Sequence, residues 1–160
     1  MKILHVIPSL SPKLGGPPQV AMNLVRALCQ SGIDAEIVTT NHDGATELDV
    51  PLNQRVDYSF REDGTTVPVW FLPFKRPALK EFIFSPELTQ WLWQRVPHYD
   101  VLDNHYLFCY APTCAAAIAR WYNVPYTVRT MGQLASWALT QSHLKKRIYT
   151  ALIERRNLNQ

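Results

Sequence analysis

The sequence predicts an α/β fold: a doubly wound, mainly parallel sheet flanked by helices. Strand and helix signals alternate along the 160 residues, and right-handed crossovers turn such an alternation into a parallel sheet. Segments 3–7 (ILHVI) and 67–72 (VPVWFL) are nearly continuous apolar runs, which is typical of strands buried on both faces. The length and the 47% apolar composition suit a single domain with a sizeable core.

The first strand is predicted over residues 2–7, with a break at Pro8. A loop follows, and then a helix over about residues 18–31, because proline is tolerated in a first turn where its N–H would have no helical partner. The apolar positions that recur at helical spacing, and that we expect to face the core, are Val20, Leu24, Ala27 and Leu28.

The middle of the chain holds two more strands around a long polar excursion. Residues 35–40 are short and β-branched, and residues 67–72 end at Pro73. Between them, residues 41–66 are polar and aperiodic, with room for a small hairpin. Loops of this length in compact domains are often functional.

The second half of the chain repeats the alternation. Ser85, Pro86 and Glu87 predict a helix start, because they supply an N-cap, a first-turn proline and an acidic first turn. The remaining predicted elements are a strand at 100–103, a helix at 111–121, a strand at 125–130 and a last helix at 141–158.

Ligands of doubly wound sheets bind beyond the carboxyl ends of the strands. The segments expected there are 9–16, 41–42, 105–106 and 131–132. The first contains Gly15 and Gly16 before a helix start, where glycine permits close approach to the main chain and the helix adds N–H donors and a positive dipole end. Such a turn attracts phosphate, although an ordinary β–α turn has the same pattern.

Charge and cysteine usage argue against several classes. The net charge of +3 is mild, and no basic stripe with interleaved aromatics favours nucleic acid. No apolar run approaches the roughly 18 residues that span a bilayer, and the N-terminus has no signal-peptide pattern. Cys29, Cys109 and Cys114 lack metal-type spacing, so we expect buried free thiols, a reducing cytoplasm and no metal or other cofactor.

Common nucleotide-binding patterns do not fit the strand ends. A dinucleotide fold needs G-x-G-x-x-G after the first strand and an acid after the second. Here Gly15 and Gly16 are adjacent, and the second strand ends in Thr39 and Thr40. There is also no flavodoxin-type phosphate loop, receiver-type acidic cluster, P-loop lysine or G-x-S-x-G elbow. An unrelated doubly wound nucleotide-binding domain remains as an alternative.

Several blocks occur in a specific order and spacing. They are MKILHVIPSLSP at 1–12, the paired glycines, AMNLVRAL at 21–28, SGIDAEIVTT at 31–40, YDVLDNH at 99–105, VPYTVRTMG at 124–132 and IYTALIERR at 148–156. Together they resemble the N-terminal domain of glycosyltransferases of the GT-B fold, in particular family 4 (group 1). The resemblance covers nearly the whole chain.

The resemblance implies a division of labour. In that family the N-terminal domain binds mainly the acceptor, and a C-terminal domain binds the nucleotide-sugar donor. We therefore expect residues 1–160 to be one Rossmann-like acceptor-side domain that lacks its donor-binding partner domain. The implied activity is retaining, metal-independent transfer of a sugar to a sugar or lipid-linked acceptor, in cell-envelope or exopolysaccharide synthesis, with the isolated chain inactive. The alternative is a non-catalytic glycan-, lipid- or protein-binding module of the same fold.

The family context also suggests roles for individual residues. Gly15 and Gly16 would face the donor phosphates, with Lys13 adding positive charge. His105, expected just beyond a strand, is the catalytic candidate that contacts a sugar hydroxyl or an acceptor group; the alternative is a structural histidine packed on Tyr106. His42 is a further acceptor-side candidate, although its neighbours are also turn formers.

Met131 is the main departure from the family pattern, which has a histidine there. Methionine neither donates a normal hydrogen bond nor carries a proton. Arg129 and Gly132 are the other acceptor-side candidates next to it, with packing at the edge of the core as the alternative for Arg129. The missing histidine favours the non-catalytic alternative and puts ordinary family-4 sugar specificity in doubt.

Basic and aromatic residues suggest peripheral contact with anionic lipid at the inner face of the membrane. A solvated helix face and core aromatics are the alternative interpretation. The basic residues are Lys145, Lys146, Arg147, Arg155 and Arg156 on the last helix, and Lys75, Arg76 and Lys80 near the aromatics Phe74, Phe82 and Phe84, which we expect to be exposed.

Overall fold

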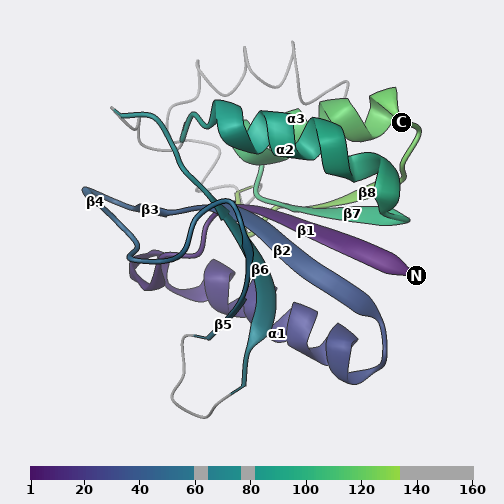
Figure 1. Ribbon diagram of the computed structural model, residues 1–160, viewed down its shortest axis with the longest axis horizontal. Helices are drawn as coiled ribbons and strands as arrows, with labels where there is room; N and C mark the ends of the chain where they lie inside the picture. The colour runs from purple at the N-terminus through teal and green to yellow at the C-terminus, as the bar shows by residue number, and fades with distance from the viewer. Residues whose placement is uncertain (60–64, 77–81, 134–160) are drawn as a thin grey trace.

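A six-stranded sheet with helices on both faces dominates the molecule (Figure 1). The computed structural model describes residues 1–59, 65–76 and 82–133. Within this six-stranded sheet, every neighbouring pair of strands is parallel except β5 with β6. The predicted doubly wound, mainly parallel sheet is therefore confirmed. In spatial order the strands are β5 (Arg55–Tyr58), β6 (Val67–Leu72), β2 (Asp34–Thr40), β1 (Lys2–Ser9), β7 (Val101–His105) and β8 (Tyr126–Arg129).

In the described part of the chain, helices cover both faces of the sheet (Figure 1). The helix α1 (Gly16–Gln30) packs on one face, and α2 (Pro86–Arg95) and α3 (Tyr110–Trp121) pack together on the other. The Ser85 side chain caps α2 by accepting from the Leu88 N–H, as predicted. Short 3-10 turns, η1 (Pro12–Leu14) and η2 (Val96–His98), precede α1 and follow α2.

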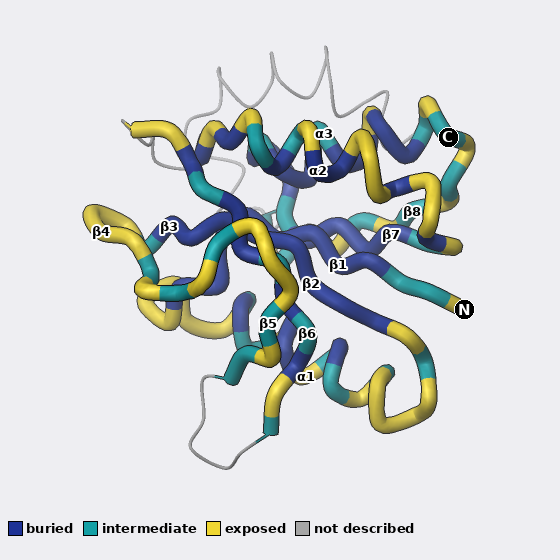
Figure 2. The backbone as a smooth tube through the Cα atoms, in the orientation of Figure 1, coloured by how far each residue is buried: buried dark blue, intermediate teal, exposed yellow. Residues whose placement is uncertain are grey.

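The core has two parts, one on each side of the sheet. Buried segments meet at the central strands (Figure 2). Leu4 and Val6 of β1 pack toward α2 and α3, whereas Ile7 packs toward α1. Burying each large apolar side chain stabilises the fold by about 1.5–3 kcal/mol, so both faces of the central strands contribute to stability.

The first strand does not break at Pro8, contrary to the prediction. It continues to Ser9, with an irregular register between Val6 and Ser9. Proline is tolerated at such a bulge because no ladder N–H is required there. The Pro8 carbonyl accepts a 2.7 Å hydrogen bond from Thr40 Oγ1, which ties the ends of β1 and β2 together.

The buried face of α1 differs from the prediction. Val20 is exposed, and the fully buried apolar positions are Ala21, Met22 and Val25. Of the other predicted positions, Ala27 is exposed, whereas Leu28 is half-buried and packs against the core cluster on this face. Cys29, expected to be buried, is exposed, although its Sγ lies 3.3 Å from the Ala35 carbonyl oxygen. The three cysteines form no disulfide.

The long segment after β2 contains the small hairpin that the sequence analysis allowed for residues 41–66. It consists of β3 (His42–Asp43) and β4 (Thr46–Glu47). The strand β5 was missed, because it is a polar edge strand defined by antiparallel pairing with β6 rather than by an apolar run. Within the described part of the chain, no helix combines the length and the apolar character needed to cross a membrane.

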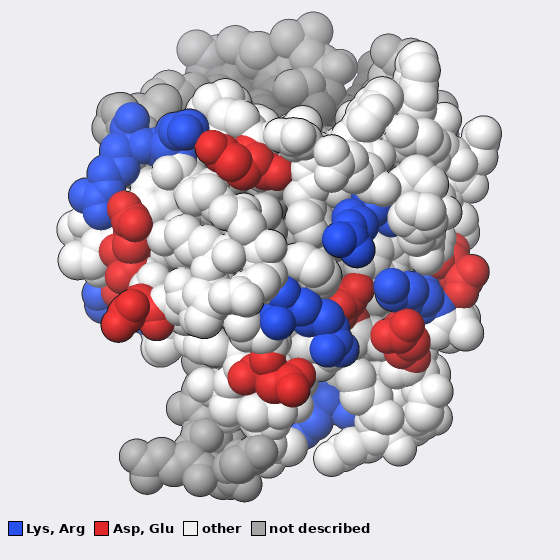
Figure 3. All heavy atoms as spheres, in the orientation of Figure 1, with Lys and Arg blue, Asp and Glu red and all other residues white. Residues whose placement is uncertain are grey.

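The surface carries mixed charge. Figure 3 shows basic and acidic side chains next to each other on this face of the molecule. Lys75 pairs with Glu87 at 3.0 Å, and Arg76 pairs with Glu47 at 3.1 Å. Phe74, expected to be exposed, is buried, whereas Phe82 and Phe84 are exposed. The predicted last helix, its basic residues and Lys80 lie outside the described residues.

Candidate functional site at the strand tips

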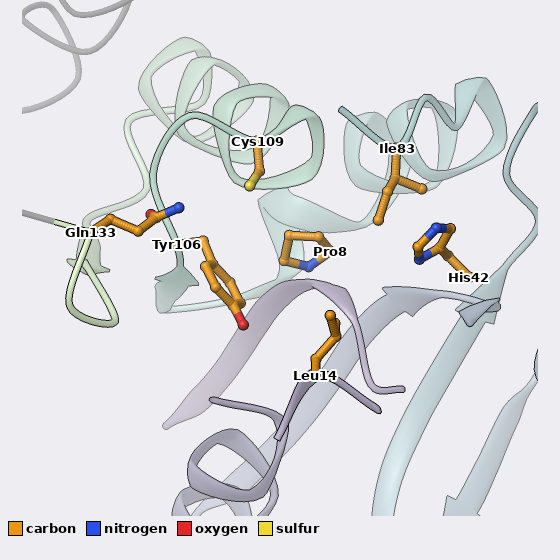
Figure 4. A pocket seen from close by; sticks show the side chains of 7 residues that line it. All are labelled: Pro8, Leu14, His42, Ile83, Tyr106, Cys109 and Gln133. Carbon is orange, nitrogen blue, oxygen red and sulfur yellow. The ribbon is translucent and has the colours of Figure 1, made fainter. Parts of the chain in front are cut away.

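A pocket of about 150 Å³ opens beside the carboxyl end of β1 (Figure 4). The strand order reverses at this point, with β2 on one side of β1 and β7 on the other, which is where doubly wound sheets bind ligands. The pocket therefore lies where the strand-end rule predicts a site. The residues that line it are Pro8, Leu14, His42, Ile83, Tyr106, Cys109 and Gln133.

The glycine turn leads from η1 into α1. Gly15 has φ 73° and ψ −127°, a conformation that side-chain-bearing residues rarely adopt. Nothing lies within 4 Å of the position that a Cβ would occupy on Gly15 or on Gly16. A ligand can therefore approach the main chain at both glycines.

The turn offers fewer N–H donors than the sequence suggests. The first four N–H groups of a helix have no intrahelical partner. Here the Gly15 N–H already donates to the Pro12 carbonyl at 3.1 Å, and Pro17 and Pro18 have no N–H. Gly16 therefore supplies the remaining backbone donor of the first turn. The positive end of the α1 dipole still faces the same space.

Lys13 is paired with the hairpin that follows β2. Its Nζ lies 2.5 Å from Asp43 Oδ2, and Ser11 Oγ donates to Asp43 Oδ1 at 2.5 Å. The hydrogen bond from Lys13 lowers the pKa of Asp43 to about 2, with Ser11 acting in the same direction. This pair links η1 to β3, so Lys13 is not an isolated charge beside the glycine turn.

His42 lies in the pocket wall. Its ring packs edge-to-face on Phe74, with centroids 5.1 Å apart, and its Nδ1 lies 3.4 Å from the Gly44 N–H nitrogen. Burial lowers the pKa of His42, which leaves the ring neutral near pH 7. Of the two histidine candidates, His42 is the one that reaches the pocket.

His105 lies inside the sheet rather than beyond it, which corrects the expected position. It is the last residue of β7 and is fully buried, and its Nε2 lies 3.1 Å from His5 Nδ1. The predicted strand ended at Asp103, but register pairing with β8 extends β7 through Asn104 and His105. His105 does not line the pocket.

The residues His5, Asp103 and His105 form a buried cluster whose donor atoms lie within 4.8 Å of one another. Burial lowers the pKa of both histidines to about 4, so both rings are neutral at pH 7. Two imidazoles and a carboxylate are a donor set that suits zinc. However, Arg129 Nε donates to Asp103 Oδ2 at 2.6 Å, and its charge opposes a cation there.

Arg129 and Thr127 hold the carboxylate of Asp103. Thr127 Oγ1 donates to Asp103 Oδ1 at 2.8 Å, and Arg129 uses the other oxygen. Arg129 belongs to the same polar network as His5 and His105, on the β8 side. This acceptor-side candidate therefore contacts the sheet interior, and it does not line the pocket.

Met131 and Gly132 form a tight turn after β8. Their φ angles are 48° and 80°, and the Gln133 N–H donates to the Thr130 carbonyl at 2.9 Å. Two positive φ angles define a type I′-like turn. The turn places Gln133 in the pocket wall, while Met131 and Gly132 do not line it.

The loop between β7 and α3 carries the most unusual backbone. Tyr106 has φ 77° and Phe108 has φ 56°, which for bulky residues is a genuine outlier and is common at functional sites. Two hydrogen bonds hold the loop: the Tyr106 N–H donates to the Arg129 carbonyl at 2.9 Å, and the Leu107 N–H donates to Gln133 Oε1 at 2.5 Å. The strained Tyr106 presents its ring to the pocket (Figure 4).

The sequence named some pocket residues only as parts of strand-end segments. Leu14, His42 and Tyr106 lie in those segments, but only His42 was assigned a role. Pro8 was taken as a strand breaker. Ile83, Cys109 and Gln133 gave no usable signal, because their positions depend on how distant segments pack.

Comparison with known proteins supplies the family. The family model of the glycosyl transferase 4-like domain matches residues 15–160, a span that begins at the paired glycines. None of the curated proteins matches the chain. The match covers most of the sequence and agrees with the fold and with the motif order. The chain therefore belongs to the glycosyl transferase 4-like domain family.

Proposed function

We propose that this chain is the acceptor-side half of a retaining glycosyltransferase. The whole enzyme moves a sugar from a nucleotide-sugar donor to an acceptor hydroxyl, in the cytoplasm, for a cell-envelope or exopolysaccharide product. Family membership and the pocket at the strand-order reversal support this assignment. The single observation that carries it is the family match over residues 15–160.

In the proposed reaction the sugar leaves a nucleoside diphosphate, and the acceptor hydroxyl attacks the same face of the sugar. The new bond joins the sugar carbon to the acceptor oxygen, while the bond between that carbon and the diphosphate oxygen breaks. The diphosphate leaves with the bonding electrons and takes up the hydroxyl proton. Positioning and charge stabilisation are the work of the protein in such a step. We assign positioning of the acceptor to the pocket residues. Gly15 and Gly16 admit the donor phosphates, which meet the Gly16 N–H and the positive end of α1.

His105 has a positioning role in this proposal. Its burial and its contact with His5 support a role inside the sheet. The pair stiffens the end of β7, from which Tyr106 enters the pocket. We accordingly assign direct contact with the acceptor to Tyr106 and His42.

The division of labour is tested by donor binding. A donor-binding half supplies most contacts to the nucleotide-sugar, so the isolated chain is expected to show weak or no binding of UDP- and GDP-sugars in calorimetric titration. The protein that carries both halves is expected to transfer sugar from one of the same donors. Tight donor binding by the isolated chain would contradict the proposal.

A non-catalytic binding module is the second candidate. Met131 in place of the family histidine favours it, because methionine supplies neither a strong donor nor a proton. The two candidates differ in one readout: a module binds an acceptor analogue, but the two-half protein releases no nucleoside diphosphate from any of the UDP- or GDP-sugars.

Peripheral membrane contact is a further part of the proposal. The exposed side chains of Phe82 and Phe84 support it, while the pairing of Lys75 and Arg76 with acids reduces the local positive charge. Pelleting with vesicles tests it directly. Binding that rises with the anionic lipid fraction is expected, and equal binding to neutral and anionic vesicles would count against electrostatic attraction.

A further inference from the structure

The helix α3 is apolar on its outer side as well as on its buried side. The buried side consists of small apolar residues that pack into the core. On the opposite side, four uncharged residues follow one another at the spacing of one helix face: Tyr110, Cys114, Ala117 and Trp121. Ala117 is exposed, and Trp121 is 70% exposed. Helices that are apolar all round are covered on every side, so we expect a partner to cover this outer side.

An aromatic cluster lies at each end of the outer side of α3. Trp93 of the adjacent α2 is 46% exposed and packs on Trp121, with ring centroids 5.8 Å apart. At the other end, Phe82 and Phe84 pack edge-to-face on Tyr110, at 5.3 Å and 5.1 Å. Tyr110 and Trp121 lie about 16 Å apart along the helix axis. The two clusters, with the small side chains of α3 between them, form what we call the α2/α3 face.

Among the described residues, no charged side chain belongs to the α2/α3 face. The two helices contain three charged residues, and each of these contacts another segment of the chain. Glu87 forms an ion pair of 3.0 Å outside α2, and the Arg95 guanidinium lies over the ring of Trp70, 5.0 Å from its centroid. Arg120 Nη1 lies 3.5 Å from Tyr126 OH. Exposed aromatic rings without charge are typical of the core of a protein–protein interface.

The lack of charge favours a second copy of this chain as the partner. In a two-fold dimer the same patch meets itself, so charges of one sign would repel their own copies. The chain carries a net charge of +3, but the residues that define the α2/α3 face contribute none of it. A surface of anionic lipid would instead require cations on the face. The face is therefore compatible with itself.

A two-fold axis near the middle of α3 also matches the shape of the face. The outer residues closest to the middle are Cys114 and Ala117, and their small side chains allow two helices to approach closely. Antiparallel pairing of α3 with its copy then brings the Trp121 end of one chain onto the Tyr110 end of the other. Both ends are aromatic, so each cluster meets another aromatic cluster.

We propose that this chain forms a two-fold dimer through the α2/α3 face. Ala117 lies next to the axis, and Trp121 of each copy packs against the aromatic cluster around Tyr110 of the other copy. Large aromatic side chains of this kind supply much of the binding energy at interfaces. None of the residues that define the face lines the pocket at the strand tips, so the dimer is independent of the proposed function.

Sedimentation equilibrium of the 160-residue chain tests the proposal. A face built on two short helices is at the small end of specific interfaces, which are weak and transient. We therefore expect the average mass to rise from that of one chain toward that of two as the concentration is raised about a hundredfold, to about 0.5 mM. A chain that stays monomeric would overturn the proposal, because the residues after 133 or a different protein would then cover the face.

A matched pair of variants localises the contact. Ala117→Arg places like charges on both sides of the axis and is expected to weaken the dimer at least about tenfold. Ala27→Arg is the control, because Ala27 is also an exposed alanine in a helix but lies on α1, across the sheet. The control is expected to dimerise like the parent chain. Thermal unfolding of both variants confirms that each is folded.

Mixing two variants tests the two-fold arrangement itself. Ala117→Glu alone is expected to weaken the dimer as Ala117→Arg does. Because the two side chains meet across the axis, an equimolar mixture of these variants pairs opposite charges and is expected to associate at least about tenfold more tightly than either variant alone.

Four results would count against the dimer as described. They are normal association of Ala117→Arg, equal weakening by Ala27→Arg, no gain in the mixture, and growth beyond two copies, which indicates an open head-to-tail contact. None of these results depends on donor binding or sugar transfer.

Discussion

Two buried polar clusters lie in the same sheet, and they differ in how well their atoms are paired. Near the amino ends of the strands, the carboxylate of Glu36 accepts hydrogen bonds from Tyr99 OH, from Trp70 Nε1 at 3.0 Å and from Arg55 Nε at 3.0 Å. Lys2 Nζ lies 3.6 Å away. Burial would raise the pKa of Glu36, but these hydrogen bonds outweigh it and lower the pKa.

Toward the carboxyl ends of the strands, the pairing is incomplete. His5 Nε2, His105 Nδ1 and both amide atoms of Asn104 are buried and have no hydrogen-bond partner among the described residues. Each such group costs about 1–3 kcal/mol of stability. The strained backbone of Tyr106 and Phe108 adjoins the same edge. The paired polar groups at the amino ends of the strands therefore stabilise the fold. The unpaired groups at the carboxyl ends destabilise it next to the pocket.

The largest expected effect comes from removing the well-paired carboxylate. Glu36→Ala leaves the Tyr99 and Trp70 donors without their acceptor, and we expect a loss of about 3 kcal/mol in the free energy of unfolding. Asp34→Ala, at the exposed start of the same strand, is the matched control and is expected to change stability by less than about 0.5 kcal/mol. Urea denaturation measures both variants, and equal losses would contradict the stabilising role assigned to the hydrogen bonds of Glu36.

The buried histidines are expected to make stability pH-dependent. Burial holds their folded pKa at about 4, against an unfolded value of 6.5, so the unfolded chain binds more protons between these values. Stability is then full above pH 6.5 and falls as the pH approaches 4. Between about pH 7.5 and 5, each histidine contributes a loss of about 2 kcal/mol.

Histidine variants isolate this effect in denaturation curves recorded at both pH values. His105→Gln is expected to flatten the pH dependence by about 2 kcal/mol, because it removes one titrating group. His98→Gln, at an exposed position, is the control for the substitution of histidine by glutamine itself. A parent chain equally stable at both pH values would show that the pair is not buried as described.

The glycine turn gives a smaller effect with an internal control. Gly15→Ala forces a Cβ onto φ 73°, and we expect a loss of about 1–2 kcal/mol from backbone strain alone, since no atom lies within 4 Å of the new Cβ. Gly16→Ala meets the same open space without a positive φ, so its stability is expected to stay within about 0.5 kcal/mol. Equal losses in thermal unfolding would contradict the conformation assigned to Gly15.

The smallest expected effect is at the exposed pair beside the turn. Lys13 is 65% exposed at its side chain, and exposed pairs contribute about 0–1 kcal/mol. Lys13→Ala is thus expected to cost less than about 1 kcal/mol, and less at high salt. The measurement is the free energy of unfolding of the parent chain and the variant at low and at high salt. A loss of stability that is larger than this and independent of salt would place Lys13 in a tighter contact than the structure has.

The fold could be predicted from the sequence because the local apolar and capping patterns agree with the parallel arrangement of the strands. Apolar runs identified β1 and β6, and the Ser85 cap identified α2. The local pattern failed where pairing over long distances decides the structure. The strand β5 exists because of its antiparallel partner β6, and the end of β7 is set by pairing with β8.

The sequence predicted where the site lies but not which residues line it. The strand-end rule placed Leu14, His42 and Tyr106 at the pocket edge, because the carboxyl ends of parallel strands meet there. It gave no information on Ile83 or Gln133, which reach the pocket only through tertiary packing. His105 was misplaced for the same reason as the end of β7.

Under the proposed function, the most direct test of the contrast between the two edges is sugar transfer per folded molecule by the two-half enzyme proposed above. Leu14→Asn at the carboxyl edge is expected to lower kcat/KM about tenfold with unchanged unfolding. Glu36→Gln at the amino edge is expected to lower stability while kcat/KM per folded molecule stays within about twofold. The reverse pattern, normal transfer by the Leu14 variant and impaired transfer by the folded Glu36 variant, would contradict the assignment of function to the strand tips.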